Sequence, residues 1–186
     1  MLSSVLLLSS VPLLPFVILA LPFALLAFER KQPRDFPKQL SLDYFNPAKS
    51  ILRAVRLLLL MLLVLLVLAN FLNFLGFLDS RKVFDFILAQ NAFTLFLAAS
   101  VGPIGEELFF RGYLQKRVGV IFSSALFAAL HLGYGSIAEV LAAFSISVLL
   151  GIELRKNNDL HACILAHAGY NIITIVSALH FPNVFV

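Results

Sequence analysis

The sequence has little charge, a single cysteine and no tryptophan. Only 13% of its 186 residues are Asp, Glu, Lys or Arg, whereas 61% are hydrophobic, and the mean hydropathy is +0.97. A water-soluble domain needs a polar surface that this composition cannot supply, so we infer an integral membrane protein. The one cysteine, Cys163, excludes an internal disulfide, and no CxxC or Cys/His run has the spacing of a structural zinc site.

The net charge is +4 and the pI is about 9.5, which raises the question of a nucleic-acid partner. The basic residues, however, fall between apolar blocks instead of gathering on one soluble face. We therefore interpret them as signals of membrane topology and expect the lipid bilayer, and no nucleic acid, as the surroundings of the chain.

The apolar blocks predict an all-α fold, a polytopic membrane helical bundle of about six transmembrane helices. A hydrocarbon core needs about 20 helical residues. The first block lacks the basic start and the cleavage site of a signal peptide, so we expect it to be a span. The polar segment 29–50 is expected to be an interfacial loop. The expected spans are 4–28, 51–78, 83–118, 120–133, 136–153 and 160–180.

The third span is too long to be one straight transmembrane helix. Residues 83–118 would extend roughly 50 Å at 1.5 Å per residue, well beyond the bilayer core. Gly102 and Pro103 are the expected place of a kink, because proline removes a backbone donor and clashes with the preceding turn.

The distribution of Lys and Arg predicts the orientation. With six spans, the loop 29–50 and the turns at 116–119 and 154–159 lie on one side of the membrane. Every Lys and Arg that stands between apolar blocks is on that side, except Arg81 and Lys82. The positive-inside rule makes that side cytoplasmic, so both termini are expected outside.

Several ionisable side chains are predicted to lie at one membrane depth. Glu106 and His131 stand about 12 residues on either side of a hairpin turn, and His167 stands about 10 residues beyond the next turn that faces the same side. At 1.5 Å per residue all three lie roughly 15 to 19 Å from that side. Asn171 follows His167 by four residues and shares its helix face. Ionisable residues inside a membrane are functional candidates.

Other ionisable residues have simpler interpretations. Glu107 and Arg111 are four apart and fit a structural ion pair, since a charge in lipid must be compensated locally. His161 and His180 lie near segment ends and are expected at the interface. Cys163 is expected to be a small buried thiol.

The residue types at this depth suit hydrolysis of a carbonyl compound. A buried carboxylate can take a proton from water, and a histidine can orient that water or pass the proton on. A second histidine and an asparagine amide can donate hydrogen bonds to a developing oxyanion. A peptide bond within or beside the membrane is the expected substrate.

Three motifs in this order on successive apolar segments resemble the CPBP family, the CAAX-protease and bacteriocin-processing membrane proteins. The family contains glutamic-type intramembrane endopeptidases like the type II CAAX prenyl endopeptidase. The resemblance covers about residues 95–180, so it implies a catalytic helical core at 95–186 and helices without family motifs at 1–94, in one membrane domain. The motifs are Glu106-Glu107-x-x-x-Arg111, Phe127-x-x-x-His131 and His167-x-x-x-Asn171.

The resemblance also implies roles, substrates and a location. The substrate would be a membrane-bound protein or peptide, such as a CAAX tail, a leader peptide or a C-terminal sorting tail, and the location a bacterial cytoplasmic membrane. The implied roles are activation of water by Glu106, assistance by His131, an oxyanion site from His167 and Asn171, and support from Glu107, Arg111 and Phe127.

A zinc enzyme is the alternative form of the same protease. Glu106, His131 and His167 could ligate zinc, but there is no HExxH motif and Asn is an uncommon zinc ligand. We therefore favour a metal-free glutamate mechanism without a cofactor.

Three other function classes remain open from the sequence. A serine protease of the rhomboid type could use Ser136, although the expected Gly-x-Ser-Gly turn is missing and Glu106 would then have no role. A transporter also buries ionisable residues, but no paired broken helices stand out. A non-catalytic immunity or scaffolding protein could carry the same motifs.

Overall fold

The computed structural model describes residues 13–181, and within this range the chain is helical, with no strand. The all-α prediction is thus confirmed. Residues 4–12 of the expected first span lie outside the described residues. The helices are α2 (Leu14–Phe28), the short η1 (Pro33–Asp35) and α3 (Phe36–Gln39), α4 (Pro47–Phe74), α5 (Arg81–Leu88), α6 (Ala92–Ala99), α7 (Val101–Glu106), the π-helix η2 (Glu107–Leu114), α8 (Gln115–Val118), α9 (Val120–Leu130), the 3₁₀ turn η3 (His131–Tyr134), α10 (Ile137–Asn157) and α11 (Leu160–His180).

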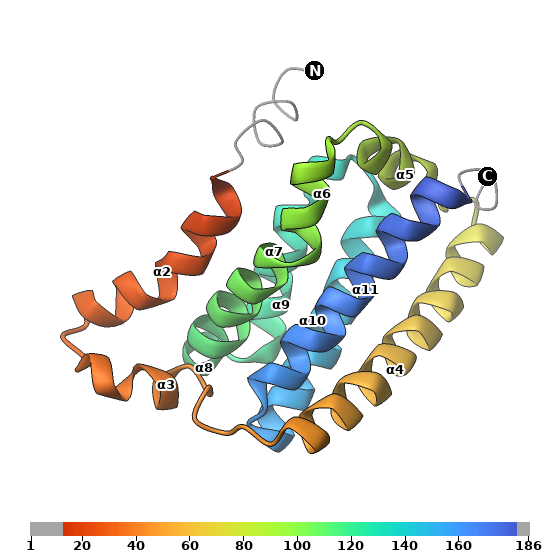
Figure 1. Cartoon of the computed structure of the whole chain (residues 1–186). Helices are drawn as coiled ribbons and strands as arrows, with labels where there is room; N and C mark the ends of the chain where they lie inside the picture. Colours follow the sequence, from red (N-terminus) through yellow and green to blue (C-terminus); the bar gives the residue numbers. More distant parts are fainter. Residues whose placement is uncertain (1–12, 182–186) are drawn as a thin grey trace.

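The long helices form a bundle in which α10 and α11 occupy the middle (Figure 1). Helix α4 packs against α10 and α11, α9 packs against α10, and α2 packs against α7. The connections around α3, α8 and the α10–α11 turn lie at one end of the bundle, and α5 lies at the other. We call the first the basic end, because Lys and Arg gather in these connections.

Within the described residues, four helices are long and apolar enough to cross a membrane, which makes the chain an integral membrane protein. The prediction of six spans is not confirmed in number. The other two apolar helices, Leu14–Phe28 and Val120–Tyr134, are shorter, and 15 residues extend only about 22 Å against a hydrocarbon core of about 30 Å. The four candidates are Pro47–Phe74, Ala92–Val118, Ile137–Asn157 and Leu160–His180.

The expected third span is divided at two places. Helix α5 is separate, and Asn91 begins α6 by accepting a hydrogen bond from the Thr94 amide at 2.9 Å. The predicted kink is present but lies at Ser100, whose backbone has φ −125° and ψ −78°. Pro103 has no N–H to donate to the carbonyl of Ala99, so the helix breaks in the turn before the proline.

The expected interfacial loop 29–50 is more deeply seated than predicted. Leu40 and Ser41 are fully buried, and α4 begins inside the predicted loop at Pro47, where Asn46 accepts a hydrogen bond from the Lys49 amide. Apolar contact explains the difference, because Leu40 lies against the backbone of the π-helix at Gly112.

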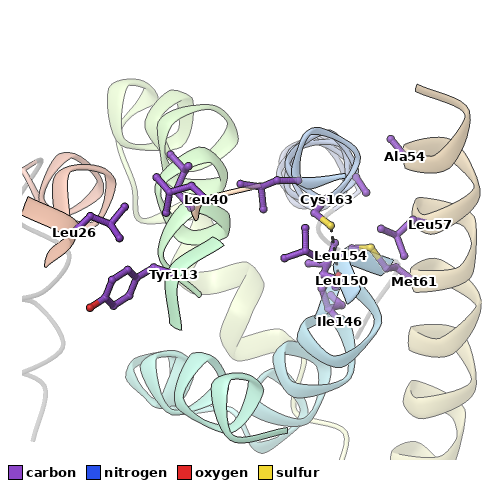
Figure 2. Close-up of a cluster of buried hydrophobic side chains, with 13 residues drawn as sticks. Leu26, Leu40, Ala54, Leu57, Met61, Tyr113, Ile146, Leu150, Leu154 and Cys163 are labelled. Carbon is purple, nitrogen blue, oxygen red and sulfur yellow. Dashed lines mark hydrogen bonds between the residues drawn. The ribbon is translucent and has the colours of Figure 1, made fainter. Parts of the chain in front are cut away.

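The buried core extends from α2 and the π-helix to α4, α10 and α11 (Figure 2). Leu57 and Met61 of α4 and Leu150 of α10 are almost completely buried. Cys163 is buried beside them, with its thiol within 3.4 Å of the Leu150 carbonyl oxygen that accepts its hydrogen bond. The prediction of a buried thiol is confirmed.

A buried carboxylate fastens the basic end. Asp159 accepts hydrogen bonds from the Ala162 amide at the start of α11 and from the Ser50 hydroxyl of α4. Arg53 of α4 pairs with the same carboxylate at 2.8 Å. These bonds hold α4 to the turn between α10 and α11.

A second carboxylate, Asp79, fastens the opposite end. It accepts hydrogen bonds from the Ser136 hydroxyl at 2.6 Å and from the amides of Ile137 and Ala138 at the start of α10, and it pairs with Lys82. Burial raises the pKa of Asp79, but these hydrogen bonds outweigh it and lower the pKa to about 2. The N-terminus of α10 is therefore bound to the connection between α4 and α5.

Helix α2 lies directly on the backbone of α7. A Cβ atom added at Gly105 would come within 2.8 Å of the Leu19 amide nitrogen and 3.2 Å of the Pro15 carbonyl oxygen. We expect Gly105→Ala to push α2 away and to lower the free energy of unfolding by about 1 to 3 kcal/mol, measured as thermal stability in detergent. Gly133→Ala is the control, because no atom lies within 4 Å of its added Cβ. Equal stability of the two variants would contradict this contact.

Candidate active site

The first motif lies where α7 passes into the π-helix. The wider turn covers Glu107–Leu114 and was not predicted from the sequence. π-turns are rare and are often found at functional sites. The transition falls between Glu106 and Glu107.

The two glutamates approach the two nitrogens of one imidazole. Glu107 Oε1 lies 2.7 Å from His167 Nδ1, and Glu106 Oε2 lies 3.8 Å from His167 Nε2. A carboxylate only accepts, so Nδ1 carries the hydrogen of the shorter contact. The Nε2 side of the ring therefore faces Glu106 across a gap wider than a hydrogen bond.

Glu107 and Arg111 form the ion pair that the sequence suggested. Arg111 Nη1 lies 3.0 Å from Glu107 Oε1, and both side chains are almost completely buried. The guanidinium stacks on Phe127, 4.5 Å from the ring centre. Glu107 Oε2 and both Nη atoms of Arg111 have no hydrogen-bond partner among the described residues, so the pair relies on charge and stacking.

His131 is oriented by its own helix. Its Nδ1–H donates to the Phe127 carbonyl oxygen at 3.0 Å, so Nε2 is the nitrogen left to accept a proton when the ring is neutral. The imidazole is also stacked with Tyr134, with ring centres 5.8 Å apart. Phe127 contacts the rings of both His131 and His167, at 4.7 and 6.0 Å between centres.

Asn171 has part of its hydrogen-bonding capacity in use. Its amide nitrogen donates to the carbonyl oxygen of Ala98 at 2.8 Å, at the end of α6 just before the helix break. A carboxamide has a second N–H, and the second N–H of Asn171 remains for a ligand.

One cavity of about 240 Å³ brings these groups together. Glu106, His131, His167 and Asn171 all line it, although they come from three separate motifs. The ionisable groups that were predicted at one depth thus share a cavity. Among the supporting residues, Phe127 lines the cavity, whereas Glu107 and Arg111 are not among its lining residues.

Tyr134, Glu139 and Tyr170 are among the cavity residues that were not predicted from the sequence. Tyr170 follows His167 by three residues on the same face, so helical spacing could have found it. Glu139 is an acidic residue in an otherwise apolar segment, which is itself a signal of function inside a membrane.

Other residues considered from the sequence lie outside this cavity. His161 contacts Phe45, with ring centres 4.9 Å apart, and His180 is exposed at the end of α11. Ser136 caps α10 by accepting from the Glu139 amide while its hydroxyl donates to Asp79. A serine held in this way has no histidine to activate it.

The zinc alternative requires three donor side chains that surround one position. Within residues 13–181, no three His, Cys, Asp or Glu side chains are disposed to hold one metal ion. Glu106, His131 and His167 line one cavity but do not form a ligand set in this arrangement, and one nitrogen of His167 is already bonded to Glu107.

The fold and cavity define a polytopic membrane protein with a carboxylate–imidazole site inside a helical bundle. Residues 88–173 match the family model described as Type II CAAX prenyl endopeptidase Rce1-like, and over this segment the chain is similar to that family. At the level of the family, this match supports a CAAX-type membrane endopeptidase, a hydrolase. Neither a curated protein nor a solved structure matches the chain significantly.

Proposed function

We propose that the protein is an intramembrane endopeptidase in which Glu106 activates water against a peptide bond. The observation that carries this proposal is the pair of adjacent glutamates around His167 at the wall of the 240 Å³ cavity. Glu107 is committed to Arg111 and His167, which leaves the Glu106 carboxylate, facing the cavity, as the base. His131 presents Nε2 to the same space and holds the water by accepting its second hydrogen.

The reaction then proceeds by proton transfer without a covalent enzyme intermediate. Glu106 takes a proton from water as the water oxygen bonds to the carbonyl carbon. The oxyanion accepts hydrogen bonds from the free N–H of Asn171 and from protonated His167, whose charge is stabilised by Glu107. Glu106 returns the proton to the leaving nitrogen as the C–N bond breaks, which gives a carboxylate and an amine.

The proposed substrate is a membrane-bound protein or peptide with an apolar segment, as in a CAAX-like tail, a leader peptide or a C-terminal sorting tail. Most of the residues that line the cavity are apolar, which suits such a segment. The test is incubation of the purified protein with synthetic apolar-tailed peptides, followed by mass spectrometry. We expect two products whose masses sum to the substrate plus one water; an intact peptide library in the presence of folded protein would contradict the proposal.

We propose that this chemistry needs no metal. Treatment with a strong chelator is expected to leave the rate of peptide cleavage unchanged within about twofold, and metal analysis of the purified protein is expected to find no stoichiometric zinc. Zinc at one equivalent, with activity that chelation removes and zinc restores, would replace the glutamate mechanism with the zinc alternative.

We also propose that the basic end faces the cytoplasm, with the start of α2 and the end of α11 outside, in a bacterial cytoplasmic membrane. Single cysteines introduced at Lys49 and Lys82 should react with an impermeant maleimide from opposite sides of sealed vesicles. Reaction of Lys49→Cys from the periplasmic side would reverse this orientation.

A further inference from the structure

The cavity contains a second carboxylate, Glu139, that the proposed reaction does not use. It belongs to the first turn of α10 and lines the cavity together with Glu106. It also lines an adjoining cavity of about 160 Å³, which the first cavity meets at the side chains of Val83, Glu139, Tyr170 and Thr174. Glu139 thus stands where the two spaces meet.

Among the described residues, no donor or cation is paired with the Glu139 carboxylate. Two other acidic side chains of the spanning helices are paired with a cation: Glu107 with Arg111, and Glu153 with Arg56 at 2.7 Å. A carboxylate at membrane depth needs compensation, and the bundle gives none to Glu139. A cation that pairs with ionised Glu139 therefore has to come from outside the bundle.

The residues that line the two cavities favour a positively charged partner for Glu139. None of the described residues that line either cavity is Lys or Arg, and the charge that the proposed reaction gives to His167 is paired with Glu107. The adjoining cavity is lined mainly by apolar side chains of α4, α5 and α10. Such walls suit the aliphatic stem of a Lys or Arg side chain, whose charged head would then reach Glu139.

The helix register gives the distance of Glu139 from the reacting groups along the bundle. Gln115 donates to the Gly151 carbonyl oxygen at 2.9 Å, which places these two residues at the same level. Glu106 precedes Gln115 by about nine residues and Glu139 precedes Gly151 by about twelve, so at 1.5 Å per residue the offset is about 5 Å. An extended peptide covers this offset in one or two residues at about 3.3 Å each.

We propose that Glu139 is a specificity residue that binds a cationic side chain of the substrate, one or two residues from the bond that is cleaved. This assignment rests on the proposed function. The substrate class is therefore an apolar membrane peptide with Lys or Arg close to the scissile bond. The acid makes no contact with the reacting atoms, so it acts on substrate choice.

The test measures binding as well as cleavage, so that the two proposals can fail separately. The probes are fluorescent peptides with one apolar segment, in which a residue flanking the apolar segment is Lys, Gln or Glu at successive positions. Binding is measured by anisotropy in the Glu106→Gln background, with and without Glu139→Gln or Glu139→Lys. Asp85→Asn, which removes an exposed carboxylate of α5 outside both cavities, is the control.

We expect the Lys peptide to bind about tenfold more tightly than the Gln peptide, as one charge-assisted contact allows. Glu139→Gln should abolish the preference, Glu139→Lys should reverse it toward the Glu peptide, and Asp85→Asn should keep it. A preference for the Lys peptide that Glu139→Gln leaves unchanged would overturn the inference. No charge preference at any position would also overturn it, and this is the result expected if the Glu139 carboxyl group stays protonated in the cavity. A charge preference in binding by a protein that cleaves no peptide would support Glu139 and reject the peptidase proposal.

Discussion

Glu106→Gln is expected to lower kcat/KM for peptide cleavage by about 10²- to 10⁴-fold, the range that a positioned general base contributes. The substitution keeps the size of the side chain and removes its ability to take a proton. Its nearest charged contact, His167 Nε2, is 3.8 Å away, so little structure depends on the lost charge. The measurement is initial cleavage rates of a fluorogenic apolar-tailed peptide in detergent or in nanodiscs.

Two further variants test whether the carboxylate at position 106 acts as the base. Glu106→Asp keeps the carboxylate but withdraws it by one methylene, and we expect an intermediate loss. His131→Gln should also lower the rate, because Nε2 no longer holds the water. Wild-type cleavage by a folded Glu106→Gln protein would reject the glutamate–water mechanism, whatever the histidine variant shows.

Glu107→Gln is expected to destabilise the protein by about 3 to 5 kcal/mol, enough to prevent its accumulation in the membrane. The change leaves Arg111, which is 1% exposed, without its counter-ion. Removal of one partner from a buried pair strands the other charge in a low-dielectric interior. The acceptor of the His167 Nδ1–H changes at the same time from a charged carboxylate to a neutral amide oxygen. Thermal unfolding by fluorescence-detected gel filtration measures the loss.

The chain offers a matched control for this pair. Arg81 and Asp85 are also four apart and 3.0 Å from each other, but both are more than half exposed, so Asp85→Asn should cost less than about 1 kcal/mol. The double variant Glu107→Gln/Arg111→Met should regain part of the stability, since no charge is left stranded. A Glu107→Gln protein as stable as Asp85→Asn would show that the buried pair does not hold this part of the bundle.

The candidate site could be predicted from the sequence because membrane helices make depth calculable. Counting residues from the turns put Glu106, His131 and His167 at one level, and the structure has all three at one cavity. The position of Asn171 could be predicted in the same way, because four residues make about one helical turn and so place Asn171 on the same helix face as His167. The constraint is physical: a helix of fixed rise that crosses a slab leaves little freedom along its axis.

Features set by contacts between distant segments could not be predicted in this way. No residue pattern in the sequence predicts the π-helix. The approach of Glu106 and Glu107 to the two nitrogens of one imidazole therefore could not be predicted. The capping of α10 by Asp79 joins residues separated by more than 55 positions. Leu40 is apolar in a polar segment, and its burial depends on Gly112, which only the folded bundle brings near.

The chain has four tyrosines and no tryptophan, and this has an optical consequence. Two of the four, Tyr134 and Tyr170, line the cavity of the candidate site. Near-ultraviolet emission from the protein therefore comes from phenol rings alone, and half of these rings would touch an occupant. A tryptophan-free ligand that enters the cavity would change that emission directly, so occupancy can be followed by intrinsic fluorescence without any label.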